Sequence, residues 1–195
     1  MSGLDTVQLM KKINDLENKI QALRTIEIAA PFYEDLRFPA TPGLLNPAVA
    51  KPDYDYTNIG YLFDPTSLES IYIIAQMPHD WVTGSTIYPH VHWMPTTTNT
   101  GNVFWAIEAK WTNINDTDAG SVSTYSGLDA GDGTAYKHQY FELGLGIAGT
   151  GKTNSSIISI RVFRFANHAS DTYTGDALLK EFGIRYLKDP TKSYE

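Results

Sequence analysis

The chain has 195 residues and a formal net charge of −7, and 42% of its residues are hydrophobic and 12% aromatic. That hydrophobic share is enough for a folded core and excludes a disordered chain, while the acidic charge argues against nucleic acid as a main partner. The chain has no cysteine, which excludes disulfides, thiol nucleophiles and zinc held by cysteine.

The N-terminal segment 4–26 has the heptad pattern of a coiled-coil helix, and Asp5 or Thr6 can cap its start. Isolated helices of about three heptads are marginal in water, so this helix needs either partner helices or its own domain to pack against. We favour partner helices, because the apolar stripe is narrow and the helix is terminal. The predicted oligomerisation seam consists of Leu9, Ile13, Leu16, Ile20 and Leu23.

The seam leaves the number of helices open. Isoleucine at a with leucine at d favours two strands, whereas Met10 at e and Ile26 at g widen the apolar face and favour three. The coil alone therefore does not decide between a dimer and a trimer.

The next segment, 29–57, is rich in proline, which prevents regular helix and central strand. We expect an extended arm laid on a surface of its own domain or of a neighbour. The prolines are Pro31, Pro39, Pro42, Pro47 and Pro52, and the apolar anchors are Phe32, Tyr33, Leu36, Phe38, Leu44 and Leu45.

From residue 58 onward, apolar and polar residues alternate with period two in short runs separated by turn residues. Runs at 71–77, 87–93, 103–111, 141–147, 158–162 and 182–186 predict strands, with weaker candidates at 59–63 and 121–126 and a turn at 127–133. No helix of crossover length lies between them, which disfavours a parallel sheet. We predict an all-β fold, an antiparallel jelly-roll-like sandwich preceded by an N-terminal coiled-coil helix, divided as 1–28, 29–57 and 58–195.

A P-loop pattern, GxxxxGK[ST], occurs at 146–153. A true P-loop opens a helix whose N-terminus binds phosphate. Here a β-branched run follows and the preceding residues also have the pattern of a strand, so we predict a hairpin loop and no nucleotide binding.

His90 and His92 lie two apart on a predicted strand and therefore point the same way. The spacing Gly-x5-His-x-His resembles the first half of the cupin metal motif, but the glutamate that cupins place after it is missing. A metal would need help from His138, Glu142 or a symmetry mate. We favour an inward histidine pair in an aromatic core beside Trp93, and hence no metal and no cofactor.

The remaining candidates are equivocal. Gly-x-Ser-x-Gly is missing and no catalytic residue stands out, so we expect no enzyme. The pairs Asp53 with Asp55 and Asp129 with Asp132 are typical of solvated turns. Four tyrosines form either an exposed sugar-binding platform or core and interface aromatics: Tyr54, Tyr56, Tyr61 and Tyr88.

Three segments, 61–64, 76–81 and 87–93, resemble a group of tailed-bacteriophage virion proteins in which an N-terminal helix precedes a β domain with a similar His-x-His-Trp strand. The run 170–179 and the closing strand through Tyr186 fit the same group, so the likeness covers most of residues 55–190. The resemblance implies a structural part of the particle, either a head decoration or spike or a tail or fibre component. Such jelly rolls are often trimers with their helices on the axis.

The leading hypothesis is therefore a homotrimeric capsid decoration or head-spike protein, which binds other virion proteins such as the major capsid protein and is assembled in the host cytoplasm. The alternatives are a carbohydrate-binding tail-fibre module and a cupin-like metalloprotein that uses the His-x-His strand. The N-terminus lacks the order of a signal peptide, and no apolar run approaches the roughly 20 residues that span a bilayer, so we expect no membrane partner.

Overall fold

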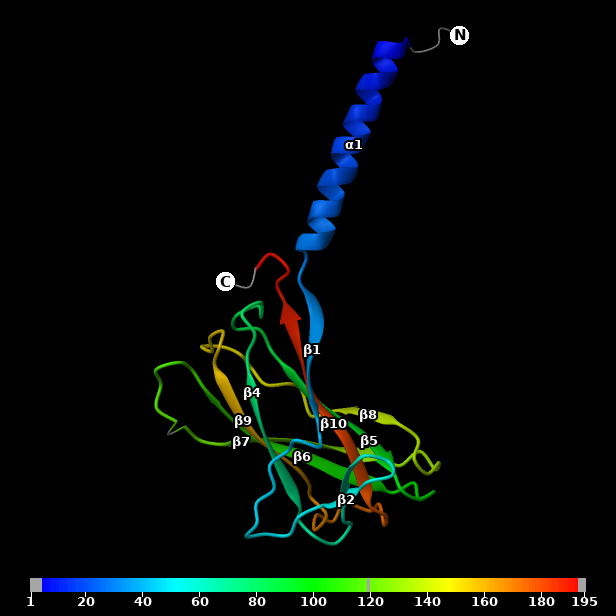
Figure 1. Ribbon diagram of the computed structural model, residues 1–195, viewed down its shortest axis with the longest axis vertical. Coiled ribbons are helices and arrows are strands. Elements are labelled where there is room, and N and C mark those ends of the chain that lie inside the picture. Colours follow the sequence, from blue (N-terminus) through cyan, green and yellow to red (C-terminus); the bar gives the residue numbers. More distant parts are fainter. Residues whose placement is uncertain (1–4, 119, 193–195) are drawn as a thin grey trace.

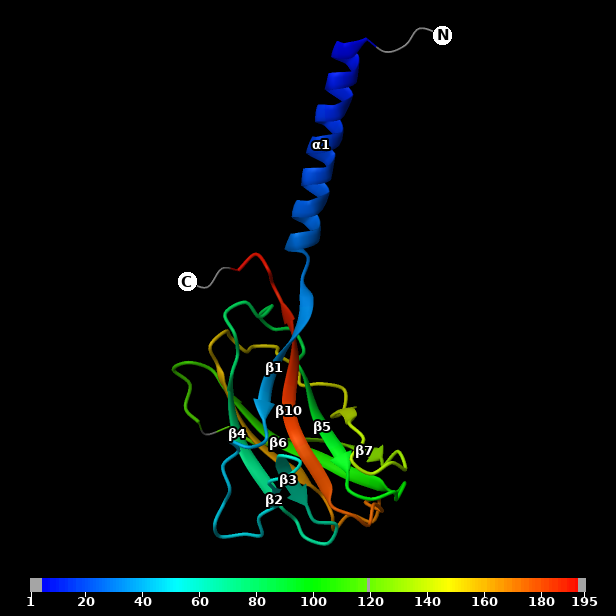
Figure 2. The ribbon, with the colours of Figure 1, turned by 45° about the vertical axis from the view of Figure 1, so that its right-hand side comes forward.

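The computed structural model describes residues 5–118 and 120–192, apart from the side chains of residues 25–29, and consists of one long helix and a β-sandwich (Figure 1). Helix α1 (Thr6–Ala29) projects away from one end of the sandwich in both ribbon views (Figure 2). Residues 1–4 of the predicted helical segment and 193–195 of the predicted β domain lie outside the described residues.

Both ends of α1 follow from local chemistry. The carboxylate of Asp5 accepts a hydrogen bond from the backbone N–H of Gln8 at 2.7 Å, which confirms one of the two predicted caps. At the other end Ala30 is extended, with φ −73° and ψ 132°, because the residue before a proline is driven out of the helical region.

The sandwich consists of two antiparallel sheets. The first, here called sheet A, has the strand order β2-β3-β10-β5-β8, and β1 also pairs with β10. The second, sheet B, has the order β4-β9-β6-β7. In the described residues the strands are β1 (Phe32–Pro39), β2 (Asp53–Asp55), β3 (Gly60–Phe63), β4 (Ser70–Gln76), β5 (Tyr88–Pro95), β6 (Asn102–Thr112), β7 (Ser123–Ala130), β8 (Gln139–Glu142), β9 (Ile157–Arg164) and β10 (Ala177–Lys188).

The core lies between the sheets and is formed by one face of each alternating strand. Trp93 of β5, Trp105 of β6 and Phe63 of β3 are fully buried there and meet edge to face at 5.4–6.0 Å. The antiparallel sandwich expected from the period-two runs is thus present, and the weak candidates at 59–63 and 121–126 correspond to β3 and β7.

One predicted strand is wrong. The run 141–147 was expected to continue its alternation, but β8 ends at Glu142. Gly144 and Gly146 have φ of +70° and +88°, which ends extended structure and leaves Leu145 97% exposed. The predicted turn at 127–133 is also displaced, because β7 continues to Ala130 along β6.

The proline-rich segment divides into two parts. Residues 32–39 form β1, which pairs with residues 181–188 of β10, whereas β3 pairs with residues 177–179 of the same strand. Two of its prolines flank this strand: Pro31 lies just before β1 and Pro39 is its last residue, where neither interrupts a central ladder. Beyond them Leu44 bridges to Tyr72 at the edge of sheet B, so 40–52 passes from one sheet to the other.

In the part of the chain that the structure describes, no helix combines the length and the apolar character that crossing a membrane requires.

Candidate functional site

The predicted seam of α1 is uncovered in the single chain. The five seam residues Leu9, Ile13, Leu16, Ile20 and Leu23 are between 46% and 65% exposed, and α1 points away from the sandwich (Figure 1). The helix therefore does not pack on its own domain, which was the alternative to packing on partner helices. A polar face remains beside the seam, where Lys19 pairs with Asp15 one turn away at 2.7 Å. The side chain of Ile26, which bears on the number of helices, lies outside the described residues.

The exposed apolar surface continues below the helix. Phe32 and Tyr33, the first two residues of β1, are each about half exposed. Tyr33 meets Tyr88 edge to face at 5.9 Å, and the guanidinium of Arg185 lies over both rings at 5.0–5.1 Å. Tyr88 therefore lies at the end of sheet A that adjoins α1, the helix that we call the stem. It does not form a platform with the other three tyrosines.

His90 and His92 lie on the outer face of sheet A, the face turned away from sheet B. Val91 and Trp93 of the same strand are fully buried in the core, so the alternation of β5 sends both histidines outward. The prediction that both histidines point inward beside Trp93 is therefore wrong, because they lie on the outer face of the sheet. Period two defines two faces but does not say which one meets the other sheet.

His90 is nevertheless only 2% exposed, because its ring lies over Gly183, its register partner on β10. A Cβ atom at Gly183 would lie 2.2 Å from the Nε2 of His90, so only glycine leaves room for the ring. Tyr140 of β8 covers the ring from the other side, with ring centroids 5.0 Å apart. Burial lowers the pKa of His90, which keeps the imidazole neutral near pH 7.

The structure brings His92 together with His138, whereas Glu142 lies opposite His90 on β8. The Nδ1 of His92 lies 2.8 Å from the Nε2 of His138, at a surface pocket of about 330 Å³ that Arg37, Lys180 and Glu181 also line. Glu142 instead forms an ion pair with Arg185 at 2.7 Å.

One hydrogen bond joins the two histidine rings, with one of the facing nitrogens donating and the other accepting. Burial also lowers the pKa of His92. Across residues 5–118 and 120–192, no group of three or more histidine, aspartate or glutamate side chains is arranged to hold a metal ion.

The P-loop-like segment is followed by a strand, as predicted, but the predicted hairpin is wrong, because β8 before it belongs to sheet A and β9 after it to sheet B. The residues after it lead into β9 and not into a helix, and its lysine is already occupied, because Lys152 Nζ donates to the backbone carbonyl of Trp111 at 2.6 Å. Thr153 likewise donates through its backbone N–H to the side chain of Asn113 at 3.1 Å. The segment is part of the connection from β8 in sheet A to β9 in sheet B.

The acidic pair at 129 and 132 has two separate roles. Asp132 is a turn residue, as predicted, and it accepts from the backbone N–H of Thr134 and pairs with Lys137. Asp129 lies in β7, where its carboxylate accepts a hydrogen bond from the indole N–H of Trp93 at 2.8 Å, and burial raises its pKa. The expectation of a solvated Asp129 is wrong, because its partner lies on the opposite sheet and carries no local signal.

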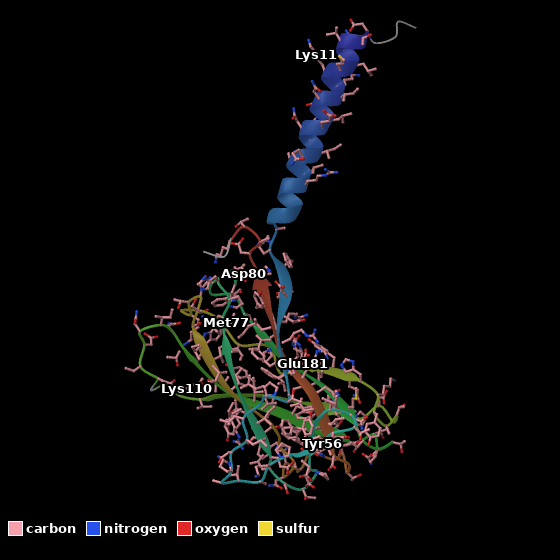
Figure 3. All side chains as sticks on the ribbon, viewed as in Figure 1. Lys11, Tyr56, Met77, Asp80, Lys110 and Glu181 are labelled. Atoms are coloured by element: carbon pink, nitrogen blue, oxygen red, sulfur yellow. The ribbon has the colours of Figure 1, made fainter. Side chains whose placement is uncertain are left out.

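Three of the four singled-out tyrosines do gather. The rings of Tyr54 and Tyr56 meet at 4.8 Å and those of Tyr54 and Tyr61 at 5.3 Å, both edge to face. Tyr61 is buried and Tyr56 is 86% exposed, so the three rings lead from the core to the solvent. Figure 3 shows Tyr56 in the part of the sandwich remote from α1.

No protein-family model and no curated protein matches this chain. Among solved structures, the CBM36-1 domain of a multidomain xylanase from the hindgut metagenome of Trinervitermes trinervoides matches 77% of this chain and 96% of its own at 8% identity, with a TM-score of 0.45. A chain of the infectious bursal disease virus Gt strain matches at 9% identity over 82% and 33%, with a TM-score of 0.40. Latent PorU from Porphyromonas gingivalis matches at 10% over 82% and 13%, also with a TM-score of 0.40. At these scores the likenesses say nothing about function.

Proposed function

We propose that this chain is a structural component of a bacteriophage virion, a homotrimeric capsid decoration or head-spike protein whose copies associate through α1. One observation carries the self-association. Five apolar side chains spaced as a heptad seam stand exposed on a helix that leaves the domain, and burying such a seam is the main driving force for coiled-coil assembly. The virion assignment rests on the resemblance of segments 61–64, 76–81 and 87–93.

Two further features support the proposal. The strand orders β3-β10-β5-β8 and β4-β9-β6-β7 match an eight-strand jelly roll with β1 and β2 added, an architecture that capsid proteins share with lectins and cupins. In addition, Phe32 and Tyr33 prolong the exposed apolar surface of the stem onto β1. A bundle of three helices, each of three heptads, is marginally stable by itself. Contacts between copies at Phe32 and Tyr33 would therefore add to the stability of the oligomer.

The absence of cysteine allows a direct test of the seam. In Leu16→Cys, oxidation joins two copies by a disulfide, because d positions of parallel helices face one another at bridgeable distance. The matched control is Leu145→Cys, on the sandwich and fully accessible, which stays uncoupled under the same dilute conditions. Equal cross-linking of both variants, or of neither, contradicts association through the stem.

The location is tested separately. Mass spectrometry of gradient-purified particles should find the chain in a fixed ratio to the major capsid protein. Its absence from the particles would remove the virion assignment and leave the self-association intact.

A further inference from the structure

The turn between β2 and β3 presents an aromatic ring to solvent that nothing in the described fold covers. The rings of Tyr56, Tyr54 and Tyr61 form a row that we call the tyrosine ladder. Tyr56 is 86% exposed, whereas Tyr54 and Tyr61 are progressively buried toward the core. Tyr54 supports the ring edge to face at 4.8 Å and 74°. The ring is thus held from one side and open on the other.

Hydrogen bonds on both sides fix the turn that presents this ring. The carboxylate of Asp55 accepts from the backbone N–H groups of Thr57 and Asn58 at 2.8 and 2.9 Å, and from the side-chain amide of Asn58 at 2.8 Å. From below, Lys180 Nζ donates to the backbone carbonyls of Asn58 and Ile59, the second at 2.6 Å. The ring is therefore preorganised, and little conformational freedom is lost when a ligand binds.

The backbone of the same turn is strained. Ile59 has φ +54°, a left-handed conformation that a β-branched side chain rarely adopts, and its side chain is itself mostly exposed. Such a conformation persists only where the surroundings enforce it, as Asp55 and Lys180 do here. The turn thus holds both an aromatic and an aliphatic side chain in water.

The size of the exposed apolar surface indicates the kind of ligand. A stable protein interface buries about 800 Å² on each partner, whereas the exposed large apolar side chains of this turn are one tyrosine and one isoleucine. A contact of this size matches one or two sugar rings, whose C–H faces pack on aromatic rings and whose hydroxyl groups need acceptors nearby.

The charges at the turn bear on the kind of sugar. The carboxylate of Asp55 and the ammonium of Lys180 act on one another, and both are already used to fix the turn. The turn therefore presents no uncompensated cation to a sialic or uronic acid or to a phosphorylated sugar.

We propose that the Tyr56 turn is a binding site for neutral carbohydrate. Tyr56 stacks on the face of a sugar ring, and the exposed Ile59 of the same turn offers further apolar surface. One such contact binds weakly, and joining several copies on one stem raises the avidity without any new contact. The site goes beyond the proposed structural role and is independent of it. If the protein bound no sugar, its proposed role as an oligomeric virion component would be unchanged.

The test uses the full-length protein and calorimetric titration with hexasaccharides of β-1,4-glucose, β-1,4-xylose, α-1,4-glucose and β-1,4-N-acetylglucosamine, together with a hyaluronan oligosaccharide as the anionic arm. At least one neutral oligomer should bind and the anionic one should not. Tyr56→Ala should lower the affinity at least tenfold, and Tyr56→Phe, which keeps the ring, by less than threefold. The control Tyr136→Ala removes another half-exposed tyrosine and should change nothing.

Three results would overturn the site. They are a lack of binding to every neutral oligomer, binding that survives Tyr56→Ala, and a preference for the anionic oligomer. A fall in the mass of the oligomer on Tyr56→Ala, with sugar binding unchanged, would make the turn a contact between copies instead. Circular dichroism of each variant separates loss of the site from loss of the fold.

Discussion

Replacing Asp171 by alanine should destabilise the sandwich by about 3–5 kcal/mol, because it leaves a fully buried guanidinium without its counter-ion. Arg164 at the end of β9 has no exposed surface, and Asp171 meets it with both carboxylate oxygens, at 2.7 and 3.0 Å. The other N–H groups of Arg164 donate to the backbone carbonyls of Phe63, Gly175 and Tyr173.

The magnitude follows from the burial of the pair. The charges of Asp64 and Asp176 also act on Arg164, but among the described residues only Asp171 forms an ion pair with it. Because the guanidinium has no access to water, deleting the carboxylate exposes the full desolvation cost of the charge. Asp171 also accepts from the backbone N–H of Phe104 at 2.9 Å, and this N–H loses its acceptor as well. A loss of this size is a large share of the roughly 5–15 kcal/mol by which a domain is normally stable.

The assay is urea unfolding of the full chain at one protein concentration, followed by circular dichroism, with Glu108→Ala as the matched control. Glu108 also pairs with an arginine, Arg161, at 3.1 Å, but both side chains are partly exposed. Its removal should cost no more than about 1 kcal/mol. If Asp171→Ala and Glu108→Ala lose similar stability, the reasoning from burial is wrong.

Three further outcomes are expected. Gly183→Ala should cost about 1–3 kcal/mol by displacing the ring of His90, and much less in a His90→Ala background, so additive losses in a double-mutant cycle would contradict the packing. Burial lowers the pKa of His90 and His92 below the ordinary value near 6.5, so their contribution to the free energy of unfolding should be lost as the pH falls below about 6.5. The His90→Gln variant should lose less stability over the same pH range in unfolding experiments. Equal slopes of stability against pH for the variant and the wild-type protein would refute this. Magnesium ATP should leave the melting temperature of the wild-type protein unchanged, whereas a shift that depends on Lys152 would restore the nucleotide-binding reading.

The fold class was accessible from the sequence because it depends on local periodicity. The heptad spacing before residue 27 and the period-two runs after residue 58 reflect the geometry of single elements, and both elements formed. Strand ends were less predictable. The run 141–147 alternates in its side chains, but the two glycines within it adopt left-handed backbone, which the pattern of apolar residues does not contain.

The chemistry of the sites was harder to predict, because it depends on contacts between distant strands. Nothing near His90 in the sequence indicates that Gly183 makes room for its ring, or that His138 faces His92. Asp129 has the local signature of a turn, and its bond to Trp93 exists only once the two sheets pack. The tyrosine ladder was partly predictable, since its three members lie within eight residues of the sequence. The sequence did not indicate which of the three is exposed.

The central claim is that the exposed seam of α1 joins copies of this chain. Light scattering of the full-length protein after size exclusion tests it directly, with Leu16→Lys as the comparison. The proposed homotrimer predicts a mass of three times 21.7 kDa for the wild-type protein and a lower mass for the variant, with the β-sheet spectrum unchanged because Leu16 is exposed in the single chain. A wild-type protein that remains a monomer at every concentration would contradict the account.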